Sequence, residues 1–247
     1  MESVLDRVIK QNTENVNLLK TKDYNIFSVL QIQSKEVLIC RMIADLLNPR
    51  GQHGAGAEYL KIFLRDCLGM EKMDTKLADQ AIVTAEYAID DERRIDIVIE
   101  IGSYFLPIEV KIYAADQKSQ CFDYYQYAKR RDAQAKVYYL TLDGHRSGKD
   151  STSSGSQSVP EEDIVCLSFR EHILNWLKAC KSCENTGMVP ILEQFIRNIE
   201  QISGYTSERV RNMVIDELLT SGDSLRAGMQ IADSINAAKA KRFCSKL

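Results

Sequence analysis

Residues 93–112 read RRIDIVIEIGSYFLPIEVKI, and they give the clearest indication of the fold. Two runs rich in Ile and Val flank Gly102 and Ser103, which predicts an antiparallel hairpin with a two-residue turn. In that register Ile95 faces Val110. Because side chains alternate along a strand, the aliphatic residues of both strands are expected on one face of the hairpin.

The other face of the hairpin carries charged side chains. Asp96 is expected opposite Glu109, and Lys111 follows two residues later on the same face. Directly opposed carboxylates repel each other, so a bound cation is the simplest remedy. Magnesium prefers oxygen ligands, and a lysine beside it can stabilise charge on a phosphate or orient water. The alternative is an exposed strand face on which the three charges are only solvated, which is common.

A helix is predicted over about 115–131, directly after this hairpin. Its spacing places Gln117, Gln120 and Tyr124 on one face, where they can overhang the acidic pair. Glutamine can hold water or a phosphate oxygen, and tyrosine can donate a hydrogen bond. The alternative is an ordinary polar helix face.

These motifs together resemble the catalytic core of the PD-(D/E)XK nuclease superfamily. The resemblance is carried by the strings R93-R-I-D-I-V-I-E, I108-E-V-K-I and D116-Q-K-S-Q120, and Gln120-x-x-x-Tyr124 is similar to the QxxxY motif of its RecB-like branch. Residues 35–56 and 138–144 are similar to a mostly uncharacterised bacterial family within the superfamily. The resemblance covers roughly residues 30–145, and Ile95 stands where the name motif has proline.

The resemblance implies a role for each matched residue. Asp96 and Glu109 would bind the metal, Mg²⁺ or alternatively Mn²⁺, and Lys111 would be the catalytic lysine. Glu36 would supplement the metal site, with a first-turn acid that favours the helix dipole as the alternative. The residues implied to orient substrate or water are Gln117, Gln120 and Tyr124. Glu86 would contact the metal-binding residues and not the metal itself. The alternative is that Glu86 is simply exposed to solvent.

The expected fold is α/β: a restriction-endonuclease-like mixed sheet of four to five strands flanked by helices, with a helical C-terminal extension. The nuclease-like core with its N-terminal helices is expected over residues 1–168, and a helical part packed on it over 169–247. Upstream helices are expected over 2–20, 34–47 with Ser34 as N-cap, and 57–68. The Ser/Gly-rich stretch 147–160 is expected to be a mobile loop.

Composition constrains the setting of the protein. The net charge is −3, but residues 111–150 carry 8 Lys/Arg against 5 Asp/Glu. This excess predicts phosphate contacts, and the residues concerned are Lys118, Lys129, Arg130 and Arg131. No membrane span or signal peptide is evident, and the odd number of cysteines favours reduced thiols and a cytoplasmic location. Cys180 and Cys183 are expected at a helix end, and His53 is expected to hold its loop.

The sequence therefore predicts a metal-dependent nuclease that hydrolyses phosphodiester bonds in DNA. RNA is not excluded, because the preference for DNA follows only from the resemblance. The alternative is a non-catalytic member that binds nucleic acid or a partner protein through the same fold. Apolar stripes in the C-terminal helices predict packing on the core or a homodimer, and they comprise Met213, Val214, Leu218, Leu219, Leu225, Met229, Ala232 and Ile235.

Overall fold

The computed structural model describes residues 24–71, 74–183, 186–205, 215–216 and 218–232. Residues 25–203 form one compact unit, and residues 1–24 with 204–247 form a second. The helix expected over 2–20 lies outside the described residues.

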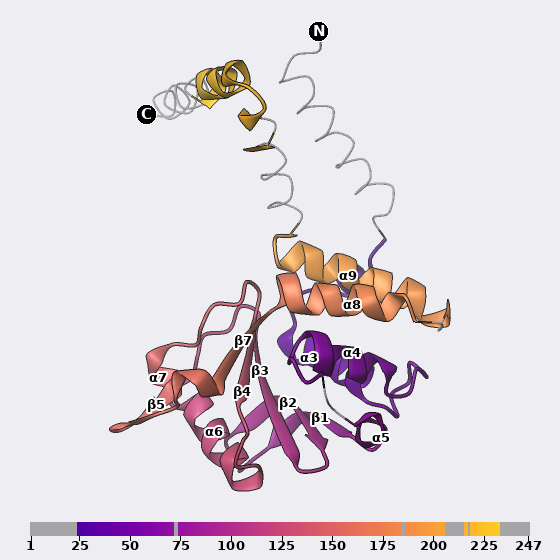
Figure 1. The fold of residues 1–247 in the computed structure, drawn as a ribbon, viewed down its shortest axis with the longest axis vertical. Helices are drawn as coiled ribbons and strands as arrows, with labels where there is room; N and C mark the ends of the chain where they lie inside the picture. Colours follow the sequence, from indigo (N-terminus) through magenta and orange to yellow (C-terminus); the bar gives the residue numbers. More distant parts are fainter. Residues whose placement is uncertain (1–23, 72–73, 184–185, 206–214, 217, 233–247) are drawn as a thin grey trace. The chain divides into compact units, whose positions relative to one another are not determined.

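A five-stranded mixed sheet is the centre of the 25–203 unit (Figure 1). The strands stand in the order β1-β2-β3-β4-β7. The pairs β1–β2 and β2–β3 are antiparallel, whereas the pairs β3–β4 and β4–β7 are parallel. The sheet confirms the expected fold class, and its strands are β1 Ile82–Ala88, β2 Arg94–Ile101, β3 Tyr104–Lys111, β4 Val137–Thr141 and β7 Ile164–Ser168.

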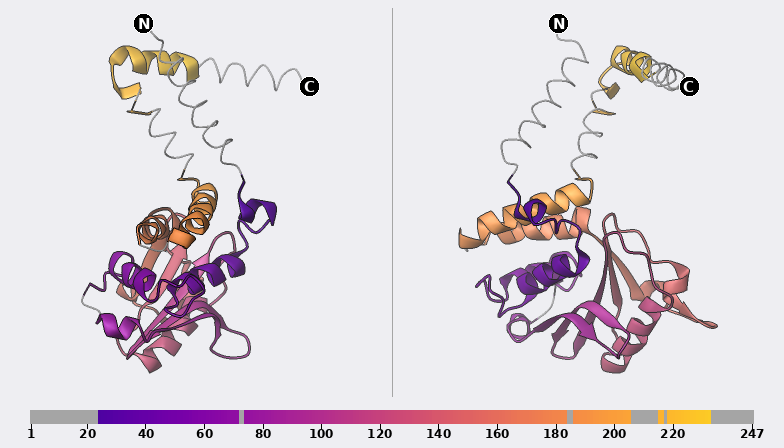
Figure 2. Two further views of the ribbon diagram at one scale, coloured as in Figure 1. Left: turned by 90° about the vertical axis from the view of Figure 1, so that its right-hand side faces the viewer. Right: turned by 180° about the vertical axis from the view of Figure 1, so that it is seen from behind.

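Helices cover both faces of this sheet (Figure 2). On one face lies α3, which contacts β1, β2 and β3, whereas α6 contacts β3 and β4 from the other side. The α-helices of the unit are α2 Ile26–Val29, α3 Glu36–Leu47, α4 Glu58–Asp66, α5 Thr75–Ala78, α6 Gln120–Arg131, α7 Lys149–Thr152, α8 Leu174–Lys181 and α9 Val189–Ile202. Single turns of 3₁₀ or π type cover Glu161–Asp163, Phe169–Ile173 and Thr186–Met188.

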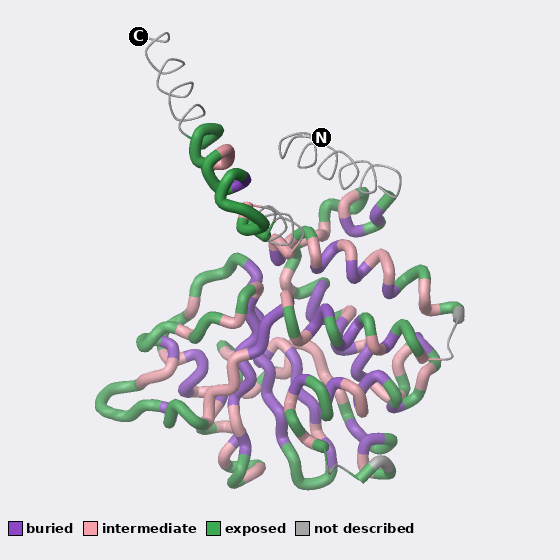
Figure 3. The backbone as a smooth tube through the Cα atoms, turned by 45° about the horizontal axis from the view of Figure 1, so that its top comes forward, coloured by how far each residue is buried: buried purple, intermediate pink, exposed green. Residues whose placement is uncertain are grey.

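Burial on both faces explains why the central strands β3 and β4 are apolar along most of their length. Every residue of β4 is buried, as is every residue of β3 after Tyr104. The buried segments of the chain run through the middle of the sheet and the inner sides of its helices (Figure 3). A strand covered on two faces has little room for solvated charge, so the charged residues on β3 are exceptional.

The hairpin register predicted from the turn is confirmed between residues 97 and 108. Ile97 pairs with Ile108 and Ile101 with Tyr104. Gly102 has a φ of 58°, a left-handed conformation that glycine adopts without strain. The ladder ends at Ile97, so the predicted pairing of Ile95 with Val110 is wrong.

Alternation also fails at this place in β2. Ile95 and Val98 pack in the same cluster of buried side chains, although strict alternation would put them on opposite faces. The partner strand is irregular too, because Glu86 has a φ of 54°. Glu86 and Asp96 lie between the pairs Ala85–Ile97 and Tyr87–Ile95. The regular alternation of side chains is therefore interrupted in both strands at Glu86 and Asp96.

Three local expectations need correction. The helix α3 begins at Glu36 with Lys35 as N-cap, so Ser34 does not cap it. The helix α6 begins at Gln120, about five residues later than expected, because Ser119 before it is left-handed. The 147–160 stretch is not a bare loop. It contains α7 and the two-stranded ribbon of β5 Ser153–Ser154 and β6 Gln157–Ser158.

In the second unit, residues 222–232 are helical. Leu225 and Met229 are exposed there, as is Leu219 just before them. Met213, Val214 and Ile235 lie outside the described residues. Within the part of the chain that the structure describes, no helix is long and apolar enough to cross a membrane.

Candidate active site

The charged side chains of the hairpin converge at the end of β3. Asp96 comes from the start of β2, Glu109 and Lys111 from the end of β3, and Glu36 from the first turn of α3. The charges of Asp96, Glu109 and Glu36 all raise the pKa of Lys111, against the effect of its burial. The structure therefore brings together the four residues that the sequence proposed for metal and catalysis.

The side chain of Asp96 takes the place of a backbone acceptor in the pairing of β2 with β3. Its Oδ2 accepts the backbone N–H of Val110 at 2.7 Å, which accounts for the end of regular pairing beyond Ile97. Burial raises the pKa of Asp96, although this N–H and Lys111 oppose the shift. The carboxylate is thus fixed against β3 beside Glu109.

The hairpin face is not the exposed one that the simpler alternative required. Glu109 is 1% exposed and Lys111 is 7% exposed, because α3 and α6 cover the two sides of the hairpin. The Lys111 ammonium donates to Glu109 Oε1. Glu109 Oε2 is buried and accepts no hydrogen bond from an N–H or O–H group of the described residues. A contact between the Glu109 and Asp96 carboxyl groups raises the pKa of Glu109 further.

Burial and repulsion act together on Glu109. Its pKa is raised well above the usual range, first by burial and then by the neighbouring charge of Asp96. Burial opposes the charge of Lys111, but the attraction of Glu109, Asp96 and Glu36 outweighs it and leaves the pKa of Lys111 raised. Three acids and one lysine leave the centre short of positive charge.

Glu36 links α3 to the chain that leaves β3. Its Oε2 accepts the backbone N–H of Ile112 at 2.8 Å. One turn further along α3, Cys40 is fully buried, and Asp96, Glu36 and Glu109 add to the effect of burial that raises the pKa of its thiol. Glu36 therefore belongs to the site by position.

The donor set suits a divalent cation, but the carboxylates are not yet arranged around one. No group of three or more His, Cys, Asp or Glu in the described part of the chain is placed to hold a metal ion. Their side chains instead form hydrogen bonds within the protein. Asp96 accepts from the Val110 N–H, Glu36 accepts from the Ile112 N–H, and Lys111 donates to Glu109. The unpartnered Oε2 of Glu109, next to a second carboxylate, is the atom that a cation would satisfy.

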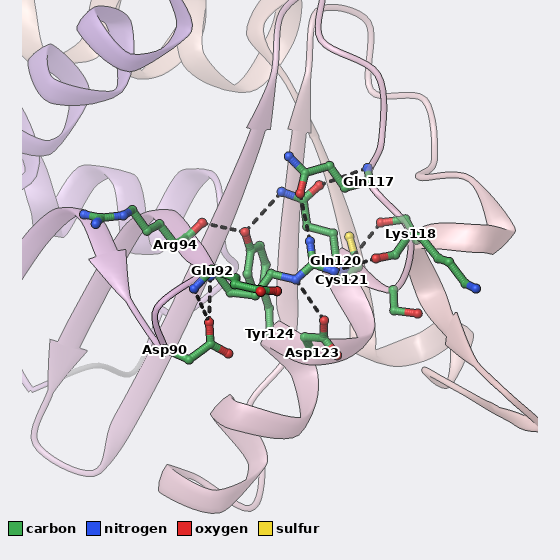
Figure 4. A network of polar contacts seen from close by, with 12 residues as sticks. Asp90, Glu92, Arg94, Gln117, Lys118, Gln120, Cys121, Asp123 and Tyr124 are labelled. Carbon is green, nitrogen blue, oxygen red and sulfur yellow. Dashed lines mark hydrogen bonds and ion pairs between the residues drawn. The ribbon is translucent and has the colours of Figure 1, made fainter.

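The predicted trio of Gln117, Gln120 and Tyr124 does not share one helical face, because Gln117 lies in the loop before α6. The three are nevertheless connected (Figure 4). Gln120 Nε2 donates to the Tyr124 hydroxyl at 3.1 Å, and that hydroxyl donates to the Arg94 carbonyl at 2.5 Å. The Gln117 N–H donates to Gln120 Oε1 at 3.4 Å. In this structure they join α6, the loop and β2.

Arg93 is a residue whose role the sequence reasoning missed. Its guanidinium donates to Asp123 at 3.0 Å, to Gln117 Oε1 at 2.8 Å and to the Lys118 carbonyl at 2.6 Å. A planar guanidinium can hold several acceptors in a fixed geometry. Its place within the R93-R-I-D string was visible, but its partners are about 25–30 residues away in sequence.

Tyr139 and Asp116 form a second contact that the sequence did not indicate. The Tyr139 hydroxyl donates to Asp116 Oδ1 at 2.7 Å, and Asp116 Oδ2 accepts the N–H of Gly148 at 2.6 Å. Tyr139 pairs with Glu109 across β3 and β4. The 147–160 segment thereby supports the loop beside the site.

The four predicted nucleic-acid contacts divide into two groups. Lys118 is exposed in the loop next to the site, whereas Lys129, Arg130 and Arg131 lie in the last turn of α6. That turn is about 15 Å from the first one at the helical rise per residue. Lys129 pairs with Asp163 at 3.2 Å and Arg131 with Glu100 at 3.3 Å.

His53 and the paired cysteines have structural positions. The N–H of Ala55 donates to His53 Nδ1 at 3.0 Å, and His53 Nε2 lies 2.9 Å from the Asn48 carbonyl. The ring also stacks on Tyr59, so the prediction that His53 holds its loop is confirmed. Cys180 is buried in α8 and Cys183 follows its end, as expected.

A buried Asp and Glu-x-Lys set thus lies at the end of an antiparallel hairpin within a mixed sheet. The protein-family comparison matches residues 24–198 to the PD-(D/E)XK nuclease superfamily. The chain belongs to that superfamily. The comparisons with curated proteins and with solved structures each found no match.

Proposed function

We propose that this protein is a metal-dependent nuclease that hydrolyses phosphodiester bonds in DNA, with Mg²⁺ as the metal. The observation that carries the proposal is the buried, unpartnered Oε2 of Glu109 beside the Asp96 carboxylate and the Lys111 ammonium. A buried carboxylate without a partner costs free energy. A divalent cation and an anionic phosphate would complete the centre.

The residues of the chain would divide the work as follows. Asp96, Glu109 and Glu36 would bind the metal, which would supply charge neutralisation at the phosphate and a means to acidify water. Lys111, released from Glu109 when the metal binds, would stabilise the negative charge that develops on the phosphate. Gln117, Gln120 and Tyr124 would keep β2, the loop and α6 in register around these groups.

Cleavage and metal titration together test the proposal. Plasmid, linear duplex and single-stranded DNA should each be incubated with protein in Mg²⁺, in Mn²⁺ and in EDTA. Metal-dependent cleavage that disappears in Asp96→Asn is the expected result. A protein that binds DNA but never cleaves it would favour the non-catalytic alternative, in which Lys111 remains the permanent partner of Glu109.

We also propose that the C-terminal helices support a homodimer. The exposed apolar side chains of the described 218–232 segment motivate this, with Leu219 at 68%, Leu225 at 43% and Met229 at 63% exposure. Exposed apolar surface of this kind commonly marks an interface. Light scattering should report a dimer for the full chain and a monomer after deletion beyond residue 205. A monomeric full chain would exclude the proposal.

A further inference from the structure

The loop from β3 to α6 holds an aromatic side chain that has no part in the proposed phosphodiester hydrolysis. Tyr113 follows Lys111 by two residues, so its Cα lies within about 7 Å of the Lys111 Cα. It is 69% exposed, and no large hydrophobic side chain in the described part of the chain is more exposed. Its hydroxyl has no hydrogen-bond partner among those residues. An exposed aromatic this near a buried catalytic centre needs an explanation.

The loop that carries Tyr113 is fixed at both ends. Before Tyr113, the N–H of Ile112 is bound by Glu36 at 2.8 Å. After it, Asp116 accepts bonds from the Tyr139 hydroxyl and from the N–H of Gly148. The backbone is thus tied to α3, β4 and the segment before α7. A group held on a fixed backbone loses little conformational freedom when it binds a ligand.

Beyond Asp116 the same loop presents a cation. The backbone carbonyl of Lys118 is held by Arg93, but its ammonium has no partner among the described residues. Figure 4 shows the Lys118 side chain directed away from the Arg94–Tyr124 contact. The neighbours of Tyr113 on the other side, Ala114 and Ala115, are small and exposed. One loop therefore offers an open aromatic ring and a free positive charge.

These features match the chemistry of an unpaired nucleotide. A base stacks on an aromatic ring, while a cation contacts the phosphate. Within a duplex the faces of the bases are already stacked on one another, so a protein ring can meet only a base in a single strand, at a frayed end or turned out of the helix. The acids of the site repel phosphate, and stacking supplies affinity that does not depend on charge.

We propose that Tyr113 and Lys118 form a nucleotide subsite for single-stranded DNA, in which Tyr113 stacks on an unpaired base and Lys118 contacts a phosphate. This inference rests on the proposed nuclease function and adds the substrate class. Tyr113 follows Lys111 by two residues, so the stacked base would belong to a nucleotide close to the scissile phosphate.

The test is direct binding without turnover. The full chain, Tyr113→Ala and Tyr113→Phe should be titrated in EDTA with a short single-stranded oligonucleotide that carries 2-aminopurine, and with the matching duplex. Tyr104→Ala is the matched control, because Tyr104 is 41% exposed at the opposite end of β3. Thermal melts should show that all three variants remain folded, since both rings are at the surface.

For single strands, Tyr113→Ala should weaken binding by about tenfold, the loss typical of one stacked base. Tyr113→Phe should retain affinity and the quenching of 2-aminopurine, and Tyr104→Ala should behave as the natural protein. Duplex binding should be unaffected by every variant. Equal loss on both substrates, absence of quenching, or no binding of single strands would overturn the subsite.

Failure of this inference is distinguishable from failure of the proposed function. Metal-dependent cleavage that is equal for single strands and duplex, and unchanged in Tyr113→Ala, would reject the subsite and leave the nuclease intact. Stacking that occurs without any cleavage in Mg²⁺ or Mn²⁺ would keep the subsite and reject catalysis. A Lys118→Ala variant that binds single strands with natural affinity would remove the cation from the subsite.

Discussion

The two ends of β3 both gather charged side chains, but they treat the charge differently. At the start of the strand, Arg131 lies over the rings of Phe105 and Tyr127 and pairs with Glu100. At the other end, Glu109 and Lys111 are buried, and Glu109 has an oxygen with no partner. The charged groups at the start of β3 all have partners within the protein, whereas at the other end one oxygen of Glu109 has none among the described residues.

This difference separates stability from function. A cation that lies over aromatic rings and pairs with an acid increases the free energy of unfolding modestly, and it leaves no group that a ligand must satisfy. Acids whose pKa values are raised by burial, as at Asp96 and Glu109, lower the stability of the protein when no ligand is bound, and such clusters are typical of functional sites. The comparison therefore predicts that substitutions at the end of β3 affect chemistry, and substitutions at its start affect stability.

The largest expected effect is the loss of cleavage from changes at the end of β3. Asp96→Asn and Glu109→Gln should weaken Mg²⁺ binding by at least about tenfold and abolish cleavage, because each removes a charged ligand. Lys111→Ala should reduce cleavage by about 10²–10³-fold while Mg²⁺ still binds, since a nearby positive charge has gone. Calorimetric Mg²⁺ titration with a cleavage assay measures both.

Glu100→Gln is the matched control for these acids, because Glu100 lies on β2 beside the start of β3 and pairs with Arg131. It should leave Mg²⁺ binding and cleavage unchanged. Equal loss of metal binding in the variants of Asp96, Glu109 and Lys111 would indicate a collapsed centre. If both Asp96→Asn and Lys111→Ala still cleave DNA, these residues do not form the catalytic centre.

The hairpin that carries this centre was predictable because its information is local. A two-residue turn and alternating aliphatic residues determine the register up to the pair Ile97–Ile108. This register brings Asp96 to the end of β3, where its side chain accepts the Val110 N–H. Burial of the pair was not predictable from the hairpin, because it depends on α3 and α6 packing from distant parts of the sequence. The same pattern on an uncovered hairpin would be an exposed charged face.

The errors near α6 have a similar physical cause. Helix propensity suggested a start at about residue 115, but the backbone there is held by partners far along the chain. The N–H of Ser119 donates to the Asp150 carbonyl at 2.7 Å, and its hydroxyl donates to the Ser153 carbonyl at 2.8 Å. These bonds involve the 147–160 segment, whose Ser/Gly composition indicated mobility. Local pattern cannot reveal such a long-range partnership.

The second largest effect is expected at Arg93, which fixes the loop next to the site. Arg93→Met should lower the free energy of unfolding by about 1–3 kcal/mol, because it removes hydrogen bonds from a charged donor. It should also reduce cleavage about tenfold by loosening Gln117 and Lys118. Urea unfolding and steady-state cleavage test this. A stability loss without any change in cleavage would show that the loop is not part of the centre.

Salt dependence provides a smaller effect that compares the two ends directly. Lys118→Ala should reduce the slope of log K against log salt by about 0.7 on single-stranded DNA, the contribution of one phosphate contact. Arg130→Ala should leave the slope unchanged on a short oligonucleotide, because Arg130 lies at the far end of α6 and over the Tyr127 ring. Binding titrations at several salt concentrations measure both slopes.

Equal changes in the two slopes would mean that the nucleic acid follows the whole length of α6. In that case the basic last turn of the helix would be a phosphate-binding surface, as its composition predicts. A slope that neither variant alters would remove both positions from the contact surface. Each of these results would change which end of β3 is assigned to the contact with nucleic acid.

The smallest expected effect concerns Arg131 itself. Arg131→Met keeps most of the apolar stem over the rings but removes the cation, its pair with Glu100 and its hydrogen bond to the Tyr127 hydroxyl. Arg131 is 46% exposed in its side chain, so solvent screens the pair and the loss should be only about 1 kcal/mol. Urea unfolding should detect it, with Arg130→Met as the control, because Arg130 lies over a single ring of the described residues, that of Tyr127 at 5.6 Å. Cleavage and DNA binding should stay unchanged. A tenfold fall in DNA binding with unaltered stability would contradict the division between the two ends, because it would make the aromatic end part of the substrate surface.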